Sequence, residues 1–470
     1  MNTNTNNTQT VSNKATSMTL AETIGKVKST ETREKLAQEV PLVPGAMVLP
    51  FILVTILFFA WGFANDITNP MVKAFSKIFL MSTTDGALVQ MAFYGGYFAM
   101  AFPAALFIRR FSYKTGIIVG LALYALGALL FIPASKIGLF SPFLVAYFIL
   151  TCGLSFLETS ANPYILSMGD PSTATRRLNL AQAFNPIGSL LGMFCAMNFI
   201  QARLDARSSD ERALMSETDF EMVKAHDLDI LSGPYVAVGL VVLLLLAIIW
   251  LTKMPNNNDQ DHSLNLGAVL KRIVKIPRYR EGVIAQVFYV GAQIMCWTFI
   301  IQYGERIFLA QGMDERAAEV LSQKYNIAAM VLFCVSRFIC TFLLKYISPG
   351  KLLMNLAIGG MLLVAAVIGL DNIYGLYALV GVSICMSLMF PTIYGIALDG
   401  LGDDAKFGAA GLIMAILGGS IMPPLQASII DKGMIAGMPA VNVSFIIPFI
   451  CFIVIAVFGY RTYTIFQSKK

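Results

Sequence analysis

Long apolar runs separated by short polar connections follow one another along this chain from about residue 47 to its end. A run of about 20 apolar residues is long enough to cross the hydrocarbon core of a bilayer as a helix. Twelve such spans are predicted, at residues 47–71, 84–108, 115–134, 142–168, 179–201, 232–252, 281–307, 321–344, 351–370, 374–397, 406–429 and 442–465. The pattern indicates an all-α membrane protein with twelve transmembrane helices.

The composition agrees with this pattern. Of the 470 residues, 57% are hydrophobic and only 13% are charged, which does not suit a soluble surface. Residues 1–45 differ, because they are rich in Thr, Asn and charge and lack the apolar core of a cleavable signal peptide. We expect them to form a cytosolic tail, either disordered or with a short amphipathic helix over residues 18–39.

The twelve spans divide into two halves of six, residues 46–253 and 281–466, joined by a polar cytoplasmic linker at 254–280. The halves echo each other. The basic segment Arg109–Lys114 after the second span has a counterpart in Lys345–Lys351 after the eighth. A weak repeat of six spans is typical of duplicated secondary transporters, whose substrate site lies between the halves near the middle of the membrane.

Basic residues gather in the connections after spans two and four and before span seven, which all fall on one side of the membrane in this topology. They are Arg109, Arg110, Lys114, Arg176, Arg177, Lys271, Arg272, Lys275, Arg278 and Arg280. Cytoplasmic loops carry the excess of Lys and Arg. We therefore place this side and both termini in the cytoplasm, with the chain in a bacterial inner membrane.

Several kinds of chemistry are not expected. The seven cysteines fall within spans without metal-ligand spacing, and the two histidines, His226 and His262, lie in loops. The chain has no nucleotide-binding glycine pattern, which argues against direct drive by ATP. No acid pair or metal cluster faces a common site, so we predict that the protein is not an enzyme. We expect no metal, no cofactor and no nucleic-acid partner.

Glu158 lies near the middle of the fourth span, where an ionised group costs roughly 2.5 to more than 10 kcal/mol. The proton affinity of a carboxyl group depends on its hydration, so a group that is alternately hydrated and occluded can load and release a proton. We predict that Glu158 carries a coupling proton. The structural alternative is a carboxylate paired permanently with Arg337 or neutralised in the core.

Asp66 is the second acid within a span, near the outer end of the first one. It either takes part in proton coupling at the border of a cavity or is a hydrated group at a helix end. The sequence supports both interpretations equally.

Polar and aromatic residues of spans one, two, four, five and seven form stripes when plotted at 100° per residue. A single amide can serve as hydrogen-bonding glue between helices, but five stripes favour a lined cavity. Asn and Gln match the hydroxyls of a sugar, and aromatic rings match its C–H faces. The predicted substrate-binding residues are Trp61, Asn65, Asn69, Gln90, Tyr94, Tyr97, Asn162, Gln182, Asn185, Gln286, Tyr289, Gln293, Trp297 and Arg337.

Arg337 is the one clear basic residue within a span, so an anionic substrate is less well matched than a neutral hexose. It either binds a sugar hydroxyl, pairs with a carboxylate or snorkels to the cytoplasmic surface.

Five motifs resemble the L-fucose:proton symporter family of the major facilitator superfamily, along nearly the whole chain after residue 45. They are Phe93-Tyr94-Gly95-Gly96-Tyr97, Phe111–Gly116, Leu157–Pro163, Arg177–Asn185 and Tyr289–Gln293. The resemblance implies a twelve-helix rocking transporter that imports fucose or a related sugar with a proton. It also implies that the acid at Glu158 takes part in coupling and that Gln182 and Asn185 line the sugar cavity.

The chain departs from that family at one place. The family has an aspartate at the position of Asn69 and an asparagine at that of Asp66. The acid has therefore either moved by one helical turn and kept its role, or that role is gone.

The expected function is proton-coupled import of a neutral hexose, L-fucose first, by alternating access. The expected partners are the sugar and the lipid bilayer, and the functional unit is a monomer. A glucose or galactose transporter of the same family, coupled to protons or sodium, is an alternative. A membrane sugar sensor that does not transport is a second one. The sequence leaves the hexose and the coupling ion open.

Overall fold

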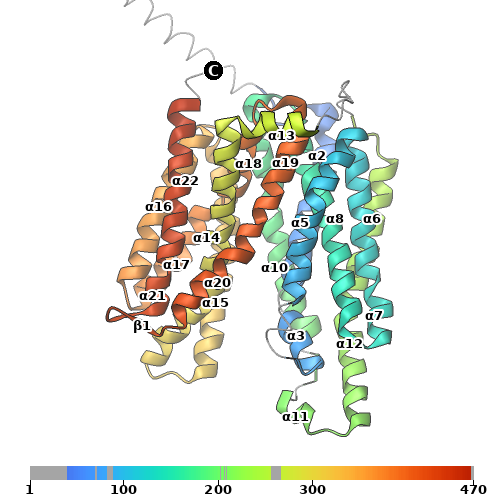
Figure 1. The fold of residues 1–470 in the computed structure, drawn as a ribbon, viewed down its shortest axis with the longest axis vertical. Helices are drawn as coiled ribbons and strands as arrows, with labels where there is room; N and C mark the ends of the chain where they lie inside the picture. Colours follow the sequence, from blue (N-terminus) through green and yellow to red (C-terminus); the bar gives the residue numbers. More distant parts are fainter. Residues whose placement is uncertain are drawn as a thin grey trace, which may run out of the picture. The chain divides into compact units, whose positions relative to one another are not determined.

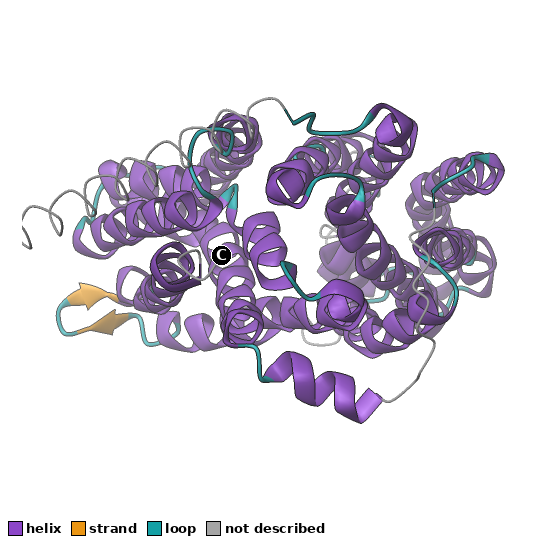
Figure 2. Cartoon of the chain, turned by 90° about the horizontal axis from the view of Figure 1, so that it is seen from above, coloured by secondary structure: helices purple, strands orange, loops and turns teal. Residues whose placement is uncertain are grey.

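The computed structural model describes residues 40–68, 71–81, 88–201, 203–205, 207, 209–255 and 266–466. The residues from Val43 onward form one compact unit, and it is almost entirely helical (Figure 2). The predicted tail, residues 1–45, lies largely outside the described residues.

The helices of the first half pack closely against one another. Helix α2 lies on α10, both α5 and α6 lie on α8, and α12 lies on α6 (Figure 1). Their bounds are α2 (Val48–Thr68), α3 (Met71–Ile78), α5 (Leu88–Arg110), α6 (Tyr113–Leu129), α7 (Phe131–Ile137), α8 (Phe140–Ser167), α9 (Ala174–Gln182), α10 (Asn185–Cys195), α11 (Ser209–Ala213) and α12 (Glu217–Leu251).

The second half is built around α14, which packs on α15, α18, α20 and α22, while α16 packs on α17 and α22. The bounds are α13 (Leu266–Val274), α14 (Pro277–Ala310), α15 (Glu315–Leu343), α16 (Pro349–Gly369), α17 (Ile373–Met386), α18 (Met389–Leu398), α19 (Ala405–Met414), α20 (Gly418–Ile430), α21 (Ala440–Ser444) and α22 (Ile446–Arg461). A short antiparallel hairpin, β1 (Met434–Ile435) with β2 (Met438–Pro439), was not predicted.

Eleven helical segments within the described residues are long and apolar enough to cross a membrane. Helix α5 is not among them, although its 23 residues are enough to cross. With α5 the number of spans is twelve, as predicted.

Some helices extend beyond the predicted apolar spans. Helix α12 begins at Glu217, well before the predicted residue 232, because Ser216 caps it and acidic residues fill its first turn. The linker 254–280 is not only a polar connection, since it holds α13 and the first turn of α14. Pro277 suits that start, because proline is favoured at the first position of a helix.

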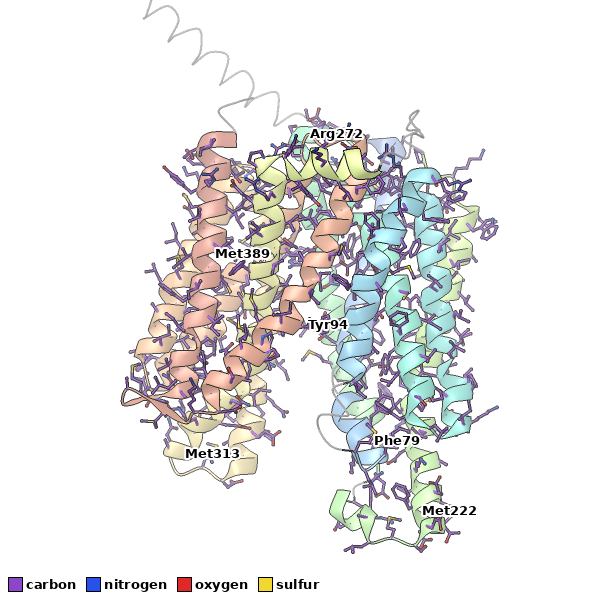
Figure 3. All side chains as sticks on the ribbon, viewed as in Figure 1. Phe79, Tyr94, Met222, Arg272, Met313 and Met389 are labelled. Atoms are coloured by element: carbon purple, nitrogen blue, oxygen red, sulfur yellow. The ribbon has the colours of Figure 1, made fainter. Side chains whose placement is uncertain are left out.

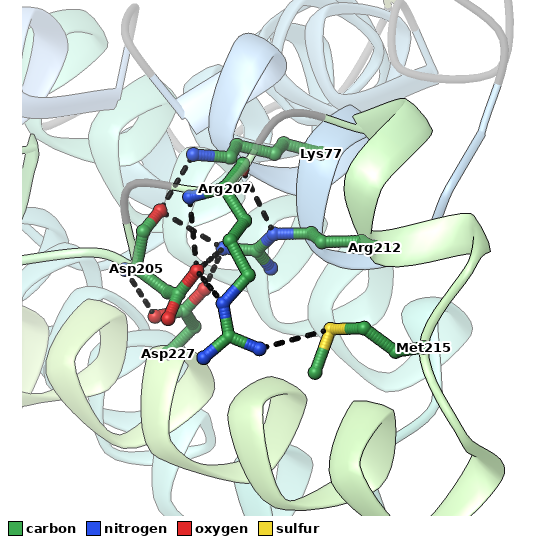
Figure 4. Close-up of polar contacts among 6 residues, drawn as sticks. All are labelled: Lys77, Asp205, Arg207, Arg212, Met215 and Asp227. Carbon is green, nitrogen blue, oxygen red and sulfur yellow. Dashed lines mark hydrogen bonds and ion pairs between the residues drawn. The ribbon is translucent and has the colours of Figure 1, made fainter.

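A buried ion pair fixes the long connection before α12. Arg212 on α11 donates to Asp227 on α12 at 2.5 Å, and both side chains are fully buried (Figure 4). Lys77 of α3 joins them by donating to the backbone oxygen of Asp205 at 2.6 Å. Because a buried charge is costly without its partner, this cluster holds α11 and α12 against α3.

Two spans are broken at a proline. Span five is divided between α9 and α10, just before Pro186, and span ten between α17 and α18, just before Pro391. Proline has no N–H, so each leaves a carbonyl group four residues earlier without its usual donor. Those two carbonyls belong to Gln182 and Ser387.

Glycines bring α2 and α10 into direct backbone contact. A Cβ atom added at Gly188 would lie 2.0 Å from the backbone oxygen of Phe59, and one at Gly192 would lie 2.5 Å from that of Phe63. No side chain fits at either position. Gly188 and Gly192, four residues apart on α10, therefore permit the close approach of the two helices.

Candidate functional site

Glu158 lies well inside α8 (Phe140–Ser167), about two thirds of the way along it, and its side chain is only 7% exposed. The indole Nε1 of Trp61 on α2 donates to Glu158 Oε1 at 2.9 Å, and the hydroxyl of Tyr97 on α5 donates to the same oxygen at 3.0 Å. Three helices thus meet at one carboxyl group. No described residue donates to Oε2, so that oxygen can take a proton while both bonds to Oε1 remain.

Two predicted amides extend this site from α8 to α9. The Nδ2 atom of Asn162 donates to the backbone oxygen of Glu158 at 3.0 Å. The Nε2 atom of Gln182 donates to Asn162 Oδ1 at 2.7 Å. All three residues are buried, and Asn162 is completely so. The structure therefore joins three of the predicted site residues into one chain of hydrogen bonds.

Arg337 lies on α15 and is 4% exposed, so it does not snorkel to the surface. Its Nε donates to the backbone oxygen of Ser387 at 2.5 Å, and one terminal nitrogen donates to that of Gln182 at 3.1 Å. Its guanidinium lies over the ring of Phe333, 4.5 Å from the centroid. Among the described residues Arg337 forms no ion pair. The ion pair with Glu158, one of the alternatives considered from the sequence, is therefore not present in this structure.

The second half contributes predicted residues from α14. Trp297 Nε1 donates to the hydroxyl of Ser383 at 3.2 Å, and its ring meets that of Phe333 edge-on at 5.0 Å. Tyr289 is fully buried, and its hydroxyl donates to the backbone oxygen of Met386 at 3.2 Å. That hydroxyl therefore bonds α14 to the end of α17.

The two glutamines of α14 differ. Gln293 is half-buried. Gln286 is completely buried, and neither atom of its amide has a hydrogen-bond partner among the described residues. Buried polar groups normally form hydrogen bonds, so the amide of Gln286 is expected to bind a polar partner that the described residues do not provide.

The other predicted residues are placed less centrally. Asn185 Nδ2 donates to the backbone oxygen of Phe58 at 3.1 Å, so its amide bonds α10 to α2. Tyr94, which is labelled in Figure 3, is half-buried on α5. Asp66 is half-buried two residues before the end of α2. Asn69 and the side chains of Asn65 and Gln90 lie outside the described part of the chain.

The two halves meet at one end of the bundle, where α5 and α8 contact α19 and α9 contacts α18 (Figure 1). The Nδ2 atom of Asn179 donates to Thr392 Oγ1 at 3.1 Å across this contact. A Cβ atom at Gly395 would lie 2.8 Å from Thr175 Oγ1. The glycine therefore permits the close crossing of α18 over α9.

The same end carries a charged cluster that includes Asp404. Arg272 of α13, which is labelled in Figure 3, donates to its two carboxylate oxygens at 2.6 and 2.7 Å, and Arg109 of α5 lies 3.9 Å away. Arg109 also lies over the ring of Phe407, 5.1 Å from its centroid. Asp404 is buried, although it lies in the connection between α18 and α19. We call this end, with Arg109, Lys114 and Arg272, the basic end.

Residues 53–423 match the Major Facilitator Superfamily. The chain belongs to this superfamily, in its L-fucose:proton symporter family. It is 52% identical to the L-fucose-proton symporter of Haemophilus influenzae over 426 residues, which cover 89% of this chain and 98% of that protein. It is 31% identical to a glucose/galactose transporter of Brucella abortus, with 86% and 92% covered.

The fold agrees with the family. Solved structures of the Escherichia coli fucose:proton symporter FucP match with TM-scores of 0.80 and 0.79, at 35% and 34% identity. The first covers 88% of this chain and 99% of that chain, and it shows FucP in the outward conformation. The predicted family and the twelve-helix major facilitator fold are confirmed, and the chain is a membrane transporter rather than an enzyme.

Three residues of this transporter's site were not predicted. Phe333 stands four residues before Arg337 on α15, so an (i, i+4) pairing of ring and cation could have been predicted. Ser387 and Asn179 had no such signal. Ser387 contributes a backbone oxygen, and Asn179 meets a partner in the other half of the chain.

Proposed function

We propose that this transporter imports L-fucose together with a proton by alternating access, with Glu158 as the coupling group. One observation carries the proposal: a carboxyl group at the middle of a span receives two hydrogen bonds on Oε1 and none from a described residue on Oε2. The L-fucose-proton symporter of Haemophilus influenzae, at 52% identity, supports the substrate and the coupling ion.

The two carboxyl oxygens of Glu158 would have different roles. Trp61 can only donate through its indole nitrogen, so Oε1 stays an acceptor whether or not Oε2 is protonated. The bonds from Trp61 and Tyr97 then hold the carboxyl group in one orientation through the cycle. Oε2 would take the proton from the outside and release it to the inside. No metal or organic cofactor is needed for this exchange.

The sugar would lie between the halves, next to this carboxyl group. Asn162 and Gln182 offer amides from the first half, while Gln293 and the ring of Trp297 face it from the second. Buried Gln286 lacks a partner for both amide atoms, and we assign a sugar hydroxyl to it in the loaded state. Tyr94, Asn185 and Arg337 would border the sugar rather than hold it.

Asn65, Asn69 and Gln90 stay predicted ligands from the sequence. Asp66 is retained as a second proton-coupling candidate. Its half-buried position near the end of α2 suits a group that water reaches from the outside.

The basic end would face the cytoplasm, because cytoplasmic loops carry the excess of Lys and Arg. The halves meet there through Asn179 and Asp404, so the structure would represent an outward-facing state. Both termini would then be cytoplasmic, in the inner membrane of a bacterium. The halves 46–253 and 281–466 would rock against each other, and one copy of the chain would suffice.

Uptake of labelled sugars by proteoliposomes under an imposed pH gradient tests this function. We expect L-fucose to accumulate ahead of D-glucose and D-galactose, without any requirement for sodium. Preferential accumulation of glucose or galactose would identify a hexose transporter of a different specificity. Binding without counterflow would identify a sensor, and dependence on sodium would overturn proton coupling.

A further inference from the structure

We propose that Arg337 is a positioning residue that clasps two backbone carbonyls, one in each half, and so holds the basic end closed. The proposal rests on the proposed function only in one respect, since alternating access requires this end to open and close. It changes the expected role of Arg337 from a sugar ligand to a lock between the halves.

Both carbonyls are free for the same reason. In an α-helix the carbonyl of residue i accepts from the N–H of residue i+4, and proline has no N–H. Pro186 stands four residues after Gln182, and Pro391 stands four residues after Ser387. A carbonyl without a donor is costly within a membrane, so each of the two requires a partner from elsewhere.

Arg337 supplies that partner to both carbonyls. Its Nε donates to Ser387 at 2.5 Å and a terminal nitrogen donates to Gln182 at 3.1 Å. The guanidinium is a planar fork of five donors, so it can serve two acceptors at once, which the compact ammonium of lysine does less well. The ring of Phe333 packs against the guanidinium of Arg337. The described residues offer this buried cation no carboxylate, which leaves the carbonyl dipoles and the ring to stabilise it.

Only one of the two hydrogen bonds of Arg337 must break when the halves separate. Ser387 and Phe333 belong to the same half as Arg337 and move with it. Gln182 belongs to the other half, so opening the basic end must break its bond to Arg337. After that break, the carbonyl of Gln182 is again without a donor. The closed state is therefore favoured until another interaction compensates.

Gln182 also connects the clasp to the proton site. Its side chain donates to Asn162, and Asn162 donates to the backbone oxygen of Glu158. Gln182, whose carbonyl accepts from Arg337, is thus linked to the backbone of Glu158 through the amide of Asn162 alone. A change in the position of Glu158 can therefore reach Arg337 through these hydrogen bonds.

The test measures how often the basic end is closed in the sugar-free transporter. Spin labels at exposed Ser172, in the connection after α8, and exposed Tyr346, in the connection after α15, report the separation of the halves at this end. The native cysteines, all unpaired, are replaced beforehand. We expect Arg337→Lys to lower the ratio of closed to open populations about tenfold, as for the loss of one charge-assisted hydrogen bond.

A double-mutant cycle with Pro186→Ala identifies the acceptor. Alanine at 186 returns an N–H group that can serve the carbonyl of Gln182. In that background we expect Arg337→Lys to change the population ratio by about threefold or less. If Arg337→Lys alone does not fold, Pro186→Ala is expected to restore it, and absence of rescue counts against the clasp.

The matched control is Asn179→Ala, which removes a bond between α9 and α18, across the same two halves, that involves no proline-freed carbonyl. Its effect should add to that of Pro186→Ala. The clasp is overturned if Arg337→Lys leaves the populations unchanged while weakening L-fucose binding tenfold or more, or if its effect is independent of Pro186→Ala. Because no sugar is present in the distance measurement, failure of the proposed substrate leaves this result intact.

Discussion

At the scale of single residues, the site depends on how one carboxyl group is held. Both Trp61 and Tyr97 donate to Oε1 of Glu158, and they come from different helices. A hydrogen bond to a charged group contributes about 1.5–3 kcal/mol, so each donor substantially stabilises the ionised carboxylate. The two donors therefore offset part of the cost of burying a charge at this position.

Removing one donor tests this arrangement. We expect Trp61→Phe and Tyr97→Phe each to lower pH-driven L-fucose accumulation about tenfold, because the ionised carboxylate loses one bond and proton release becomes the slower step. Exchange of sugar without a gradient should fall less. Trp250→Phe is the control, since Trp250 is 63% exposed on α12 and far along the chain from the site. Equal loss of exchange and accumulation would argue against this role.

The sequence indicates Glu158 for a physical reason that needs no partner. A charge within a long apolar run is costly wherever its neighbours lie, so the position alone predicts function. The bonds of Asn179 could not be predicted in this way, because its partner Thr392 is 213 residues away. The partners of Arg337 could not be predicted either, because they are backbone oxygens that its side-chain chemistry does not single out.

At the scale of helices, the twelve spans could be predicted because length and apolarity are local properties. The starts of α12 and α14 could not, because Ser216 caps α12 and Pro277 begins α14, both ahead of the apolar runs. Close packing of α2 on α10 could be predicted from the spacing of Gly188 and Gly192, but not which helix would meet them. That choice depends on contacts far apart in sequence.

The packing of α10 on α2 predicts a large effect at one glycine. We expect Gly188→Leu to destabilise the transporter by more than the 1–3 kcal/mol of ordinary overpacking, because the new side chain would meet backbone rather than a movable side chain. Thermal unfolding in detergent should show a lower midpoint. Gly233→Leu on α12 is the control, since nothing lies within 4 Å of its added Cβ. Equal midpoints for the two variants would contradict the packing argument.

At the scale of the whole molecule, the basic end joins the halves and the linker. Asp404 accepts two hydrogen bonds from Arg272 of the linker helix α13 and lies near Arg109 of α5. A buried carboxylate between two arginines from separate parts of the chain couples the linker to the closure of the halves. Closure at this end thus includes the linker as well as α9, α18 and α19.

Loss of this carboxylate should release the linker helix. We expect Asp404→Asn to increase hydrogen exchange at the backbone amides of α13 about tenfold, because Arg272 loses its charged partner. Asp399→Asn is the matched control, as it breaks a pair with Arg278, which lies on α14 rather than α13. Backbone exchange in α13 should therefore change much less in that variant. Similar exchange in both variants would show that Asp404 does not hold α13.

The most direct test of the central claim is sugar-driven proton entry. L-Fucose is added outside proteoliposomes that contain a trapped pH indicator, with no imposed pH gradient and the membrane potential clamped. The account predicts that the lumen acidifies as fucose enters, and that Glu158→Gln still exchanges fucose but no longer acidifies the lumen. Entry of fucose into vesicles with the native protein without acidification, or unchanged acidification with Glu158→Gln, would contradict it.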